Sequence, residues 1–519
     1  MAAADRTLGV VAAGHPLSAE AGADALRDGG NAVDAALAAM LASFACEPLL
    51  TGLGAGGYML VVAPGAEPAL LDFFVEAPGR GRSAAADSRS ELIPVSVSFG
   101  DAVQMFNVGA ASVGTFGMPA GVCEAARRYA RLDLARLVEP AAALAREGVA
   151  LNAQQAYIVE ILAGIVTSTP EAAALYAPGG RLLGEGERVR QPELADALQR
   201  LAREGARPFY EGDIADAIVT WLADRGGLVT AHDLRAYEVV DRPPLAVGYR
   251  GRTVLTNPPP SAGGILIARA LASLDHVGGV PDATALVDVM AATQRERTPA
   301  FLEGLNDPAF VERFLAAQRP AAPGGGHERP GGAPGPGGAL GSTTHVAALD
   351  SDGWACSVTC SAGSASGVVV PGTGVHCNNM LGEQDLNPLG FHRHPPGRRL
   401  PSMMSPTVVL RDGAPELAVG SAGSNRIRSA VLQTIVRCID DRMRAQDAVD
   451  APRLHFEDEI VYAEPGIDVA ALERAGLTVS RFRARNLFFG GAQAAMRGDD
   501  GRFSGGGDPR RGGAAVVVT

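Results

Sequence analysis

The chain has 519 residues, with 45 basic and 57 acidic side chains and a formal net charge of −12 at pH 7. It contains no lysine, so every basic residue is an arginine. This excludes a Schiff-base lysine, a Walker A phosphate-binding loop and a serine–lysine hydrolase, because each of these needs a lysine amine. The acidic balance also argues against nucleic-acid binding, which uses clustered basic residues.

The N-terminus shows no cationic start followed by a long apolar stretch, so we expect no signal peptide and a cytoplasmic location. The longest apolar run, Ala35 to Cys46, is too short to span a membrane. Scattered cysteines in such a chain are typical of reduced, buried thiols. Cys356, Cys360, Cys377 and His376 could be imagined as a metal site, but their spacing matches no zinc pattern. We therefore expect neither a metal nor a cofactor.

The N-terminal part is predicted to contain a strand, two helices and a second strand. Residues 8–12 are typical of a strand and residues 18–28 of a helix. Asn31 is predicted to cap a second helix that runs to about Phe44. A glycine-rich loop then leads into a strand at 58–62.

That loop contains Gly52, Gly54 and Gly57, which satisfy the pattern G-x-G-x-x-G. A dinucleotide-binding fingerprint needs a strand before the glycines and a helix after them. Here the predicted order is reversed, so a tight helix-to-strand turn is the better interpretation.

The middle of the chain is predicted to be helical and then to form paired strands. Residues 133–206 are largely helical, with apolar side chains at helical spacing, and 214–224 form another helix. Residues 243–260 are typical of paired strands.

The sharpest change in composition lies at 320–341, where 22 residues include 5 prolines and 9 glycines. Such a segment favours neither helix nor sheet and is typical of a linker. After it, residues 344–361 indicate a strand hairpin that turns at 351–353. Strands at 406–411 and 416–420 and a helix from about Ser424 follow. Runs of helices followed by hairpins favour an α+β fold with antiparallel sheets.

The stretch from Gly420 to Arg426, GSAGSNR, lies between a predicted strand and a predicted helix. Small residues there could let backbone N–H groups and a helix N-terminus face a developing oxyanion. A tight turn with a capped helix explains the same residues equally well.

Thr343 follows the Pro/Gly-rich segment directly and precedes a predicted strand. If the chain is cut before Thr343, the freed α-amine becomes a base beside the threonine hydroxyl. An α-amine has a pKa of roughly 7.7–8.0, which suits general-base catalysis near neutral pH. Threonine with its own N-terminal amine is a known nucleophile pair, and it needs no lysine.

Several segments in order resemble the gamma-glutamyltransferase (gamma-glutamyltranspeptidase) family. They are GVVAAGHPLSAEAGADALRDGGNAVDAALAAML, GLGAGGYML, RQPELADALQRLAREGARPFYEGDIADAIV, GGLVTAHDLRAYEVVDRPPLAVGYRGRTVLTNPPPSAGG, TTHVAALDSDGWACSVTCS, LPSMMSPTVVL, GSAGSNRI and DAPRLHF. The resemblance covers most of the chain.

The resemblance implies a four-layer αββα N-terminal-nucleophile hydrolase fold with two stacked antiparallel sheets. It also implies autocatalytic cleavage between Ser342 and Thr343. The products would be a large fragment, 1–342, which ends in the Pro/Gly-rich linker, and a small fragment, 343–519, folded together as one intertwined domain.

The resemblance also implies roles for individual residues. Thr343 would be the nucleophile, and Thr359 and Ser361 would lie on the neighbouring strand facing it, with Ser361 where the family usually has threonine. Gly423 and Ser424 would form the oxyanion hole through their backbone N–H groups.

The residues that would bind a glutamyl group depart from the family pattern. Ser402 matches the first of two substrate-binding serines, and Glu383 falls at or near an aspartate. The family's asparagine is replaced by Gly363, its glutamine by Met380 and its second serine by Met403. Its arginine is replaced by Phe74, and the nearest substitutes for that arginine are Arg80 and Arg82. Missing hydrogen-bond partners can cost on the order of 10⁴-fold in selectivity.

Three functions follow from this sequence. The first is a self-processing enzyme in which Thr343 attacks a glutathione-like γ-glutamyl amide and passes the acyl group to water or an amine. The second keeps the mechanism but acts on a non-glutamyl amide, as an acylase with a more apolar pocket. The third is a non-catalytic binding protein on the same scaffold. The expected partners are the small-molecule substrates and the two fragments themselves, with no nucleic acid and no membrane.

Overall fold

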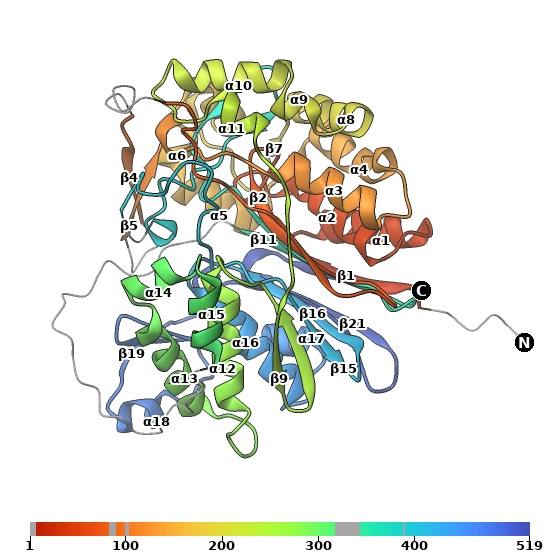
Figure 1. Cartoon of the computed structure of the whole chain (residues 1–519), viewed down its shortest axis with the longest axis vertical. Coiled ribbons are helices and arrows are strands. Elements are labelled where there is room, and N and C mark those ends of the chain that lie inside the picture. The colour runs from red at the N-terminus through yellow and green to blue at the C-terminus, as the bar shows by residue number, and fades with distance from the viewer. Residues whose placement is uncertain (1–6, 83–89, 99–102, 317–342, 388–389) are drawn as a thin grey trace, which may run out of the picture.

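The computed structural model describes residues 7–82, 90–98, 103–316, 343–387 and 390–519. Within these ranges the protein is a mixed α+β structure built around two large antiparallel sheets that pack face to face (Figure 1). This confirms the predicted combination of helices with antiparallel hairpins.

The first sheet has seven described strands in the order β22-β1-β11-β12-β2-β3-β8. These are β22 (Ala514–Val518), β1 (Gly9–Ala13), β11 (Thr344–Asp350), β12 (Ala355–Ser361), β2 (Gly56–Val62), β3 (Ala69–Phe73) and β8 (Val240–Arg242). Strands from before and after position 342 therefore pair with one another in this sheet.

The second sheet has six described strands in the order β21-β20-β16-β15-β10-β9. These are β21 (Phe503–Gly507), β20 (Gly491–Arg497), β16 (Ala414–Ala422), β15 (Thr407–Arg411), β10 (Arg252–Thr256) and β9 (Leu245–Tyr249). Strands β11 and β12 pack against β16, so the centres of the two sheets meet.

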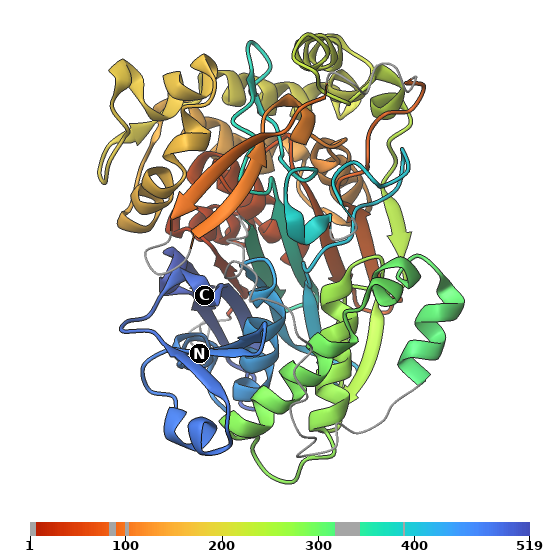
Figure 2. The same cartoon turned by 90° about the vertical axis from the view of Figure 1, so that its left-hand side faces the viewer.

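Helices cover the outer face of each sheet (Figure 1). On the first sheet these are α1 (Pro16–Arg27), α2 (Ala32–Cys46) and α3 (Met118–Tyr129), with α4 (Leu134–Glu147) and α8 (Pro192–Glu204) beyond them. On the second sheet they are α12 (Ala262–Leu274), α16 (Arg426–Ile439) and α17 (Ala445–Asp450). Turned by 90°, Figure 2 shows the yellow and orange helices at one end of the molecule and the green ones at the other.

The remaining elements surround these layers. The other helices are α5 (Ala153–Ile161), α6 (Ala163–Val166), α7 (Pro170–Tyr176), α9 (Arg207–Tyr210), α10 (Asp213–Ala223), α11 (Ala231–Arg235), α13 (Ala283–Glu296), α14 (Pro299–Gly304), α15 (Pro308–Ala316) and α18 (Val469–Arg474). The other strands are β4 (Ile93–Ser98), β5 (Val103–Val108), β6 (Val149–Ala150), β7 (Arg188–Val189), β13 (Val369–Val370), β14 (Val375–His376), β17 (Leu454–Glu457), β18 (Ile460–Ala463) and β19 (Thr478–Arg481).

Helix α2 lies at the centre of the first layer, and all of its residues are buried. Its start is fixed by Asn31, whose side chain accepts hydrogen bonds from the N–H groups of Val33 (2.8 Å) and Asp34 (3.1 Å). The Asp34 carboxylate in turn accepts from the N–H of Asn31 at 2.8 Å. This capping box confirms the predicted helix start.

The glycine-rich loop joins α2 to β2, which confirms a helix before the loop and a strand after it. A Cβ at Gly54 would lie 2.3 Å from the carbonyl oxygen of His376, and one at Gly57 would lie 2.6 Å from that of Thr359. These glycines therefore allow neighbouring backbones to approach closely, and no nucleotide site is needed to explain them.

Most other predicted elements are confirmed within a few residues, including the hairpin formed by β11 and β12 and the pair β9 and β10. One difference concerns α16, which was expected from about Ser424 and begins at Arg426. Ser424 has a φ of +51°, which is incompatible with a right-handed helix, so the turn extends further than the composition suggested.

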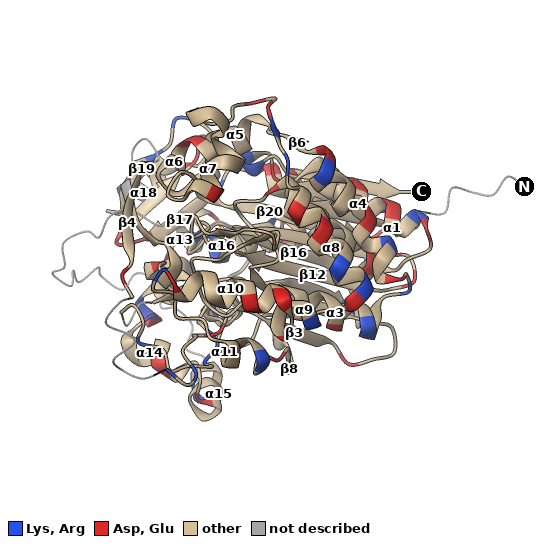
Figure 3. Ribbon diagram, turned by 90° about the horizontal axis from the view of Figure 1, so that it is seen from above, with Lys and Arg blue, Asp and Glu red and all other residues tan. Residues whose placement is uncertain are grey.

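The outer helices carry both signs of charge. Figure 3 shows acidic and basic residues interspersed along α1, α4 and α8. Some of these residues form ion pairs at the surface, such as Arg27 with Glu20 (2.6 Å) and Arg200 with Asp213 (2.7 Å). Within the described parts of the chain, no helix is both long enough and apolar enough to cross a bilayer.

Because the two sheets approach closely at Gly420, we expect that a larger residue there would destabilise the protein. A Cβ at Gly420 in β16 would lie 2.3 Å from Cε1 of the buried His345 in β11. We expect Gly420→Ala to lower the free energy of unfolding by about 1–3 kcal/mol, because the core cannot accept the extra atom. Urea unfolding measures this change. Gly248→Ala in β9 is the matched control, since a Cβ there meets nothing within 4 Å; equal midpoints for both variants would contradict the prediction.

Candidate active site

Thr343 lies at the end of the first sheet, directly before β11, and its side chain is buried beside β12. Its hydroxyl donates to Oγ of Ser361 at 3.3 Å. The N–H of Gly363 donates to the same Oγ at 3.0 Å, which fixes the Ser361 side chain. The hairpin therefore brings together two of the predicted hydroxyl residues and orients one of them through the backbone.

Thr359 occupies a different place from the one we expected. We expected it to face Thr343, but the register places Thr359 opposite His345. Oγ1 of Thr359 lies 2.8 Å from Nδ1 of His345. Burial lowers the pKa of His345 to about 3, so the imidazole is neutral at physiological pH. Thr359 and Ser361 are two residues apart, so their side chains lie on the same face of the sheet but oppose different residues of β11. This is why Ser361, and not Thr359, contacts Thr343.

The turn at Gly423 and Ser424 lies at the same end of the sheet packing. Oγ of Ser357 donates to the carbonyl oxygen of Val419 at 3.2 Å, and the next pair of opposed residues in the hairpin, His345 and Thr359, lies against Gly420. Strand β16 therefore runs along the hairpin in the direction of Thr343 and Ser361. Gly423 has a φ of +122°, and a Cβ there would lie 2.9 Å from Cα of Gly490, so this position requires glycine.

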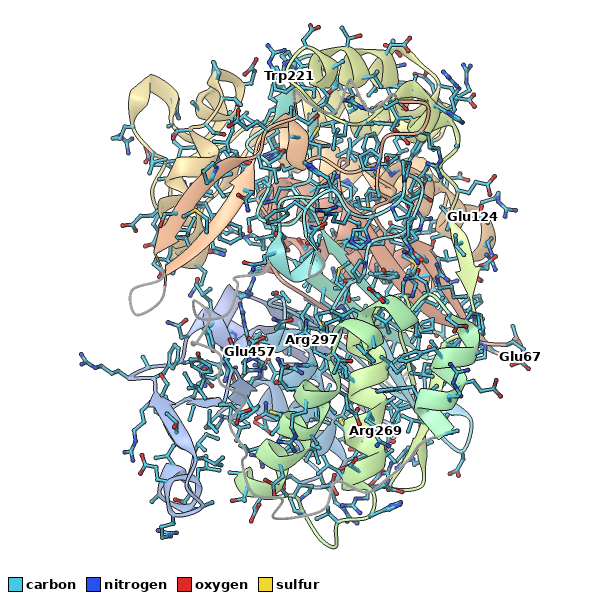
Figure 4. All side chains as sticks on the ribbon, turned by 60° about the vertical axis from the view of Figure 1, so that its left-hand side comes forward. Glu67, Glu124, Trp221, Arg269, Arg297 and Glu457 are labelled. Carbon is cyan, nitrogen blue, oxygen red and sulfur yellow. The ribbon has the colours of Figure 1, made fainter. Side chains whose placement is uncertain are left out.

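A buried polar network holds the residue after this turn. Nδ2 of Asn425 donates to Oε1 of Glu457 at 2.6 Å, and Nε2 of His455 lies 3.3 Å from Oε2. Burial by itself raises the pKa of Glu457, but the hydrogen bond from His455 and the nearby Arg428 and Arg297 lower it to about 2. Figure 4 shows Arg297 beside Glu457, and their charged groups lie 3.9 Å apart. The turn is therefore supported by a buried carboxylate.

Two charged residues that the sequence did not single out lie behind Thr343. Glu47, which follows α2, accepts a hydrogen bond at Oε2 from the hydroxyl of Thr344 at 2.9 Å. Burial raises the pKa of Glu47 to about 7, while the Thr344 hydrogen bond and Arg511 oppose this rise. Burial lowers the pKa of Arg511 to about 10. A Cβ at Gly423 would lie 3.7 Å from Nη2 of Arg511, so this arginine lies between Glu47 and the turn. No local motif signals either residue.

The predicted apolar replacements share one environment. Phe74, Met380 and Met403 are all buried in the hydrophobic cluster between the sheets and the α12 layer. Phe74 stacks on Tyr58 with ring centroids 5.3 Å apart. Gly56 of β2 pairs with Ser361 and lies close to the backbone of Phe74. Thr343, Ser361, Gly56 and Phe74 therefore follow one another across neighbouring strands of the first sheet.

Gly363 is closely covered by polar side chains. A Cβ at Gly363 would lie 1.9 Å from Oδ1 of Asn379 and 2.7 Å from Oε1 of Glu383. Both oxygens accept from the N–H of Ser364, at 2.9 and 2.8 Å. The structure thus places Glu383 beside the loop that follows Ser361, and adds Asn379, which the sequence did not single out.

The two candidate arginines are engaged with other groups. Arg80 forms ion pairs with Glu76 at 2.9 Å and with Asp233 at 3.7 Å. Nη1 of Arg82 donates to the carbonyl oxygen of Gly227 at 2.8 Å. These contacts direct both guanidinium groups to residues other than Thr343.

Ser402 is buried, and its Oγ accepts from the N–H of Met404 at 3.0 Å. Ser342, predicted to precede the cleavage site, lies outside the described residues. Burial raises the pKa of Cys356, Cys360 and Cys377, which are thiols of the core. In the part of the chain that the structure describes, no group of three or more His, Cys, Asp and Glu side chains could hold a metal ion.

The chain is similar to known proteins over almost its full length. A family model described as Gamma-glutamyltranspeptidase matches residues 18–518. The glutathione hydrolase proenzyme of Escherichia coli (strain K12) is 32% identical, over 97% of this chain and 90% of that protein. The acylase ACY 1 proenzyme of Pseudomonas sp. (strain SE83) is 30% identical, over 98% of this chain and 94% of that protein.

Solved structures show the same relation. The cephalosporin acylase from Bacillus halodurans matches with a TM-score of 0.81 and 26% sequence identity, covering 98% of this chain and 96% of that one. The similarity therefore extends over both large sheets and their helices.

The buried Glu47 predicts a specific pH dependence of stability. Its pKa rises from roughly 4.3 in an unfolded chain to about 7 in the folded one. The folded state therefore keeps a proton that the unfolded state releases, and this stabilisation is full below about pH 4.3 and lost as the pH rises through about 7. Relative to Glu47→Gln, the wild type should lose about 3 kcal/mol between pH 4.5 and 8.5 in urea unfolding.

The control for this experiment is Glu147→Gln, which removes an exposed carboxylate at the end of α4. Its stability should follow the wild type at every pH. Parallel curves for Glu47→Gln and the wild type would contradict the assignment of this pH dependence to Glu47.

Proposed function

Because the chain belongs to the gamma-glutamyltranspeptidase family, we propose that it is a self-processing enzyme whose nucleophile is Thr343. The observation that carries the proposal is the contact of the Thr343 hydroxyl with Ser361 at 3.3 Å, at the end of two paired strands. The relatives named as proenzymes support a precursor that is processed.

The proposed processing step uses the same hydroxyl. Oγ1 of Thr343 attacks the carbonyl carbon of Ser342, the peptide C–N bond breaks, and an ester forms while the nitrogen gains the hydroxyl proton. Water then hydrolyses the ester, which leaves Thr343 with a free α-amine. That amine can act as the base in later turnovers, since its pKa lies near neutral pH.

In turnover, Thr343 attacks the carbonyl carbon of the donor amide. The amide C–N bond breaks, the leaving amine takes the hydroxyl proton through the α-amine, and an acyl ester remains on Oγ1. Water or a second amine then attacks the ester and regenerates the hydroxyl. The N–H groups of Gly423 and Ser424 would stabilise the oxyanion in both steps, and such donors typically contribute about 10²–10³-fold to the rate.

The fragments 1–342 and 343–519 would stay together after cleavage in the four-layer arrangement of N-terminal-nucleophile hydrolases. The strand order supports this, because β1 and β2 from the first fragment flank β11 and β12 from the second. Separating them would expose the centre of the first sheet.

Cleavage is tested by intact mass spectrometry. The wild type should yield two fragments that divide between Ser342 and Thr343, and Thr343→Ala should remain a single inactive chain because it lacks the nucleophile. Thr343→Ser is the matched control, since it keeps a hydroxyl and should still be cleaved. Wild-type protein that stays intact after long incubation would contradict the proposal and favour a non-catalytic binding protein.

We propose a γ-glutamyl amide as the donor, as the name of the glutathione hydrolase relative indicates. A second candidate is an acylase acting on a non-glutamyl amide. It is favoured by the apolar Phe74, Met380 and Met403 in place of polar residues, and by the relative named as an acylase.

A side-by-side assay on a γ-glutamyl anilide and neutral acyl anilides distinguishes the two donors. The glutamyl donor should have the higher kcat/KM if its polar groups are bound, because a missing partner leaves the polar groups of the site unpaired. Equal or faster turnover of the neutral donors would support the acylase instead. Thr343→Ala is the blank for every donor.

A further inference from the structure

Three elements of the first layer meet directly behind the proposed nucleophile. Glu47 follows α2, Thr344 begins β11, and Gly14 follows β1. The hydroxyl of Thr344 donates to Oε2 of the buried Glu47 at 2.9 Å. A Cβ at Gly14 would lie 2.4 Å from Oε1 of Glu47 and 2.7 Å from Oγ1 of Thr344, so the end of β1 closes over this contact. Because Thr344 is covalently joined to Thr343, the contact fixes the start of the strand that follows the nucleophile.

The turn that begins at Glu47 is also bonded to the end of β12. The N–H of Ala362, the residue after Ser361, donates to the carbonyl oxygen of Leu50 at 2.8 Å. The N–H of Leu50 in turn donates to the carbonyl oxygen of Glu47 at 2.9 Å. One short turn therefore holds both the Glu47 carboxylate and the end of the strand that carries Ser361.

Arg511 brings a positive charge to the same place from near the C-terminus. Its attraction lowers the pKa of Glu47 and so opposes burial, which raises that pKa to about 7. A Cβ at Gly491 would lie 2.5 Å from Cδ of Arg511, and a Cβ at Gly423 would lie 3.7 Å from its Nη2. The guanidinium group therefore lies between β20 and the candidate oxyanion turn, where Glu47 opposes its charge.

The other titratable groups around Glu47 in the described part of the chain are neutral near pH 7. Burial raises the pKa of the Cys46 and Cys360 thiols to about 12. Burial lowers the pKa of His15, which follows Gly14, to about 4. The charges that act on the start of β11 from this side are therefore those of Glu47 and Arg511.

Cleavage before Thr343 would create a new ionisable group close to this pair of charges. The α-nitrogen of Thr343 is joined to the Thr344 hydroxyl by a few covalent bonds, so it lies within about 10 Å of the Glu47 carboxylate. A negative charge at this distance favours the protonated form of an amine. The neutral form is the one that acts as a base.

We propose that Glu47 is a positioning residue for Thr343: it fixes the start of β11 through the Thr344 hydroxyl, and its charge sets the pH at which the freed α-amine becomes a base. This inference rests on the proposed function of Thr343 and adds a residue that regulates the same site. Removing the negative charge would leave Arg511 unopposed near the amine, which would then lose its proton at a lower pH.

The pH profile of kcat/KM tests the effect of this charge, because it reports the pKa of the essential base in the free enzyme. The donor is the anilide that the wild type turns over fastest, so its own ionisation is the same for every variant. In matured Glu47→Gln, the midpoint of the rise in kcat/KM with pH should lie lower than in the wild type by about 0.5–1 pH unit.

Glu416→Gln is the matched control for the loss of a buried carboxylate. Glu416 is also buried and pairs with an arginine, Arg252, at 3.0 Å. It lies in β16, roughly 20 Å along the strand from Gly423. Charges separated by more than about 10 Å are largely screened, so the midpoint of this variant should equal that of the wild type.

Two variants of Thr344 test the positioning role separately. Thr344→Ser keeps the hydroxyl and should behave like the wild type. Thr344→Val has a similar shape without the donor, and it should lower kcat by about tenfold to a hundredfold, the cost of a small displacement of a reacting group. KM should change little, because Thr344 faces Glu47 and not the substrate. This pair decides the outcome if Glu47→Gln fails to fold or to be cleaved.

A midpoint that stays in place in Glu47→Gln, or moves to higher pH, would overturn the role of the Glu47 charge. Equal kcat values for Thr344→Val and Thr344→Ser would overturn the positioning role. Both results differ from failure of the proposed function, in which the wild type is not cleaved before Thr343 and turns over no anilide.

Discussion

The pairing of β11 with β12 is the constraint on which the rest of the site depends. The register sets Thr344 opposite Cys360, so Thr343 and Ser361 face the second sheet while Thr344 faces Glu47 and the helix layer. A slip of one residue would exchange the two faces of a strand and turn the Thr343 hydroxyl towards the helices. Such a slip would also break the pairing of this hairpin with β1 and β2. Because both faces of the hairpin are buried, its register is strongly specified.

The polar groups between the two sheets are arranged around this hairpin. The neutral His345 ring is held by Thr359 and packs against Gly420, which brings β16 close enough for its end to reach the row of Thr343. Behind the turn, Glu457 and Arg511 come from separate elements near the C-terminus. Buried polar groups need partners, and here those partners also set the position of the candidate oxyanion turn.

Arginine without lysine has a visible structural consequence. A guanidinium group has five donors in a rigid fork, so Arg399 can bond two backbone carbonyl groups and a carboxylate at once. Such multiple bonding favours buried, charge-balanced clusters over single mobile cations. The cluster that Arg399 forms with Asp72 and Glu76 beside Phe74 is one of these.

Local signals in the sequence determined the elements and their order. The cap at Asn31, the turn at 351–353 and the hairpin pattern of residues 344–361 are short-range features, since each depends on residues a few positions apart. The resemblance to a known family then predicted roles for Thr343, Ser361 and the Gly423 turn. Only the tertiary structure decided that Glu47 meets Thr344 and that Asn379 covers Gly363. A periodic pattern shows which face a side chain occupies, but contacts outside one strand or helix depend on the order and stacking of the sheets and on the paths of the loops between them.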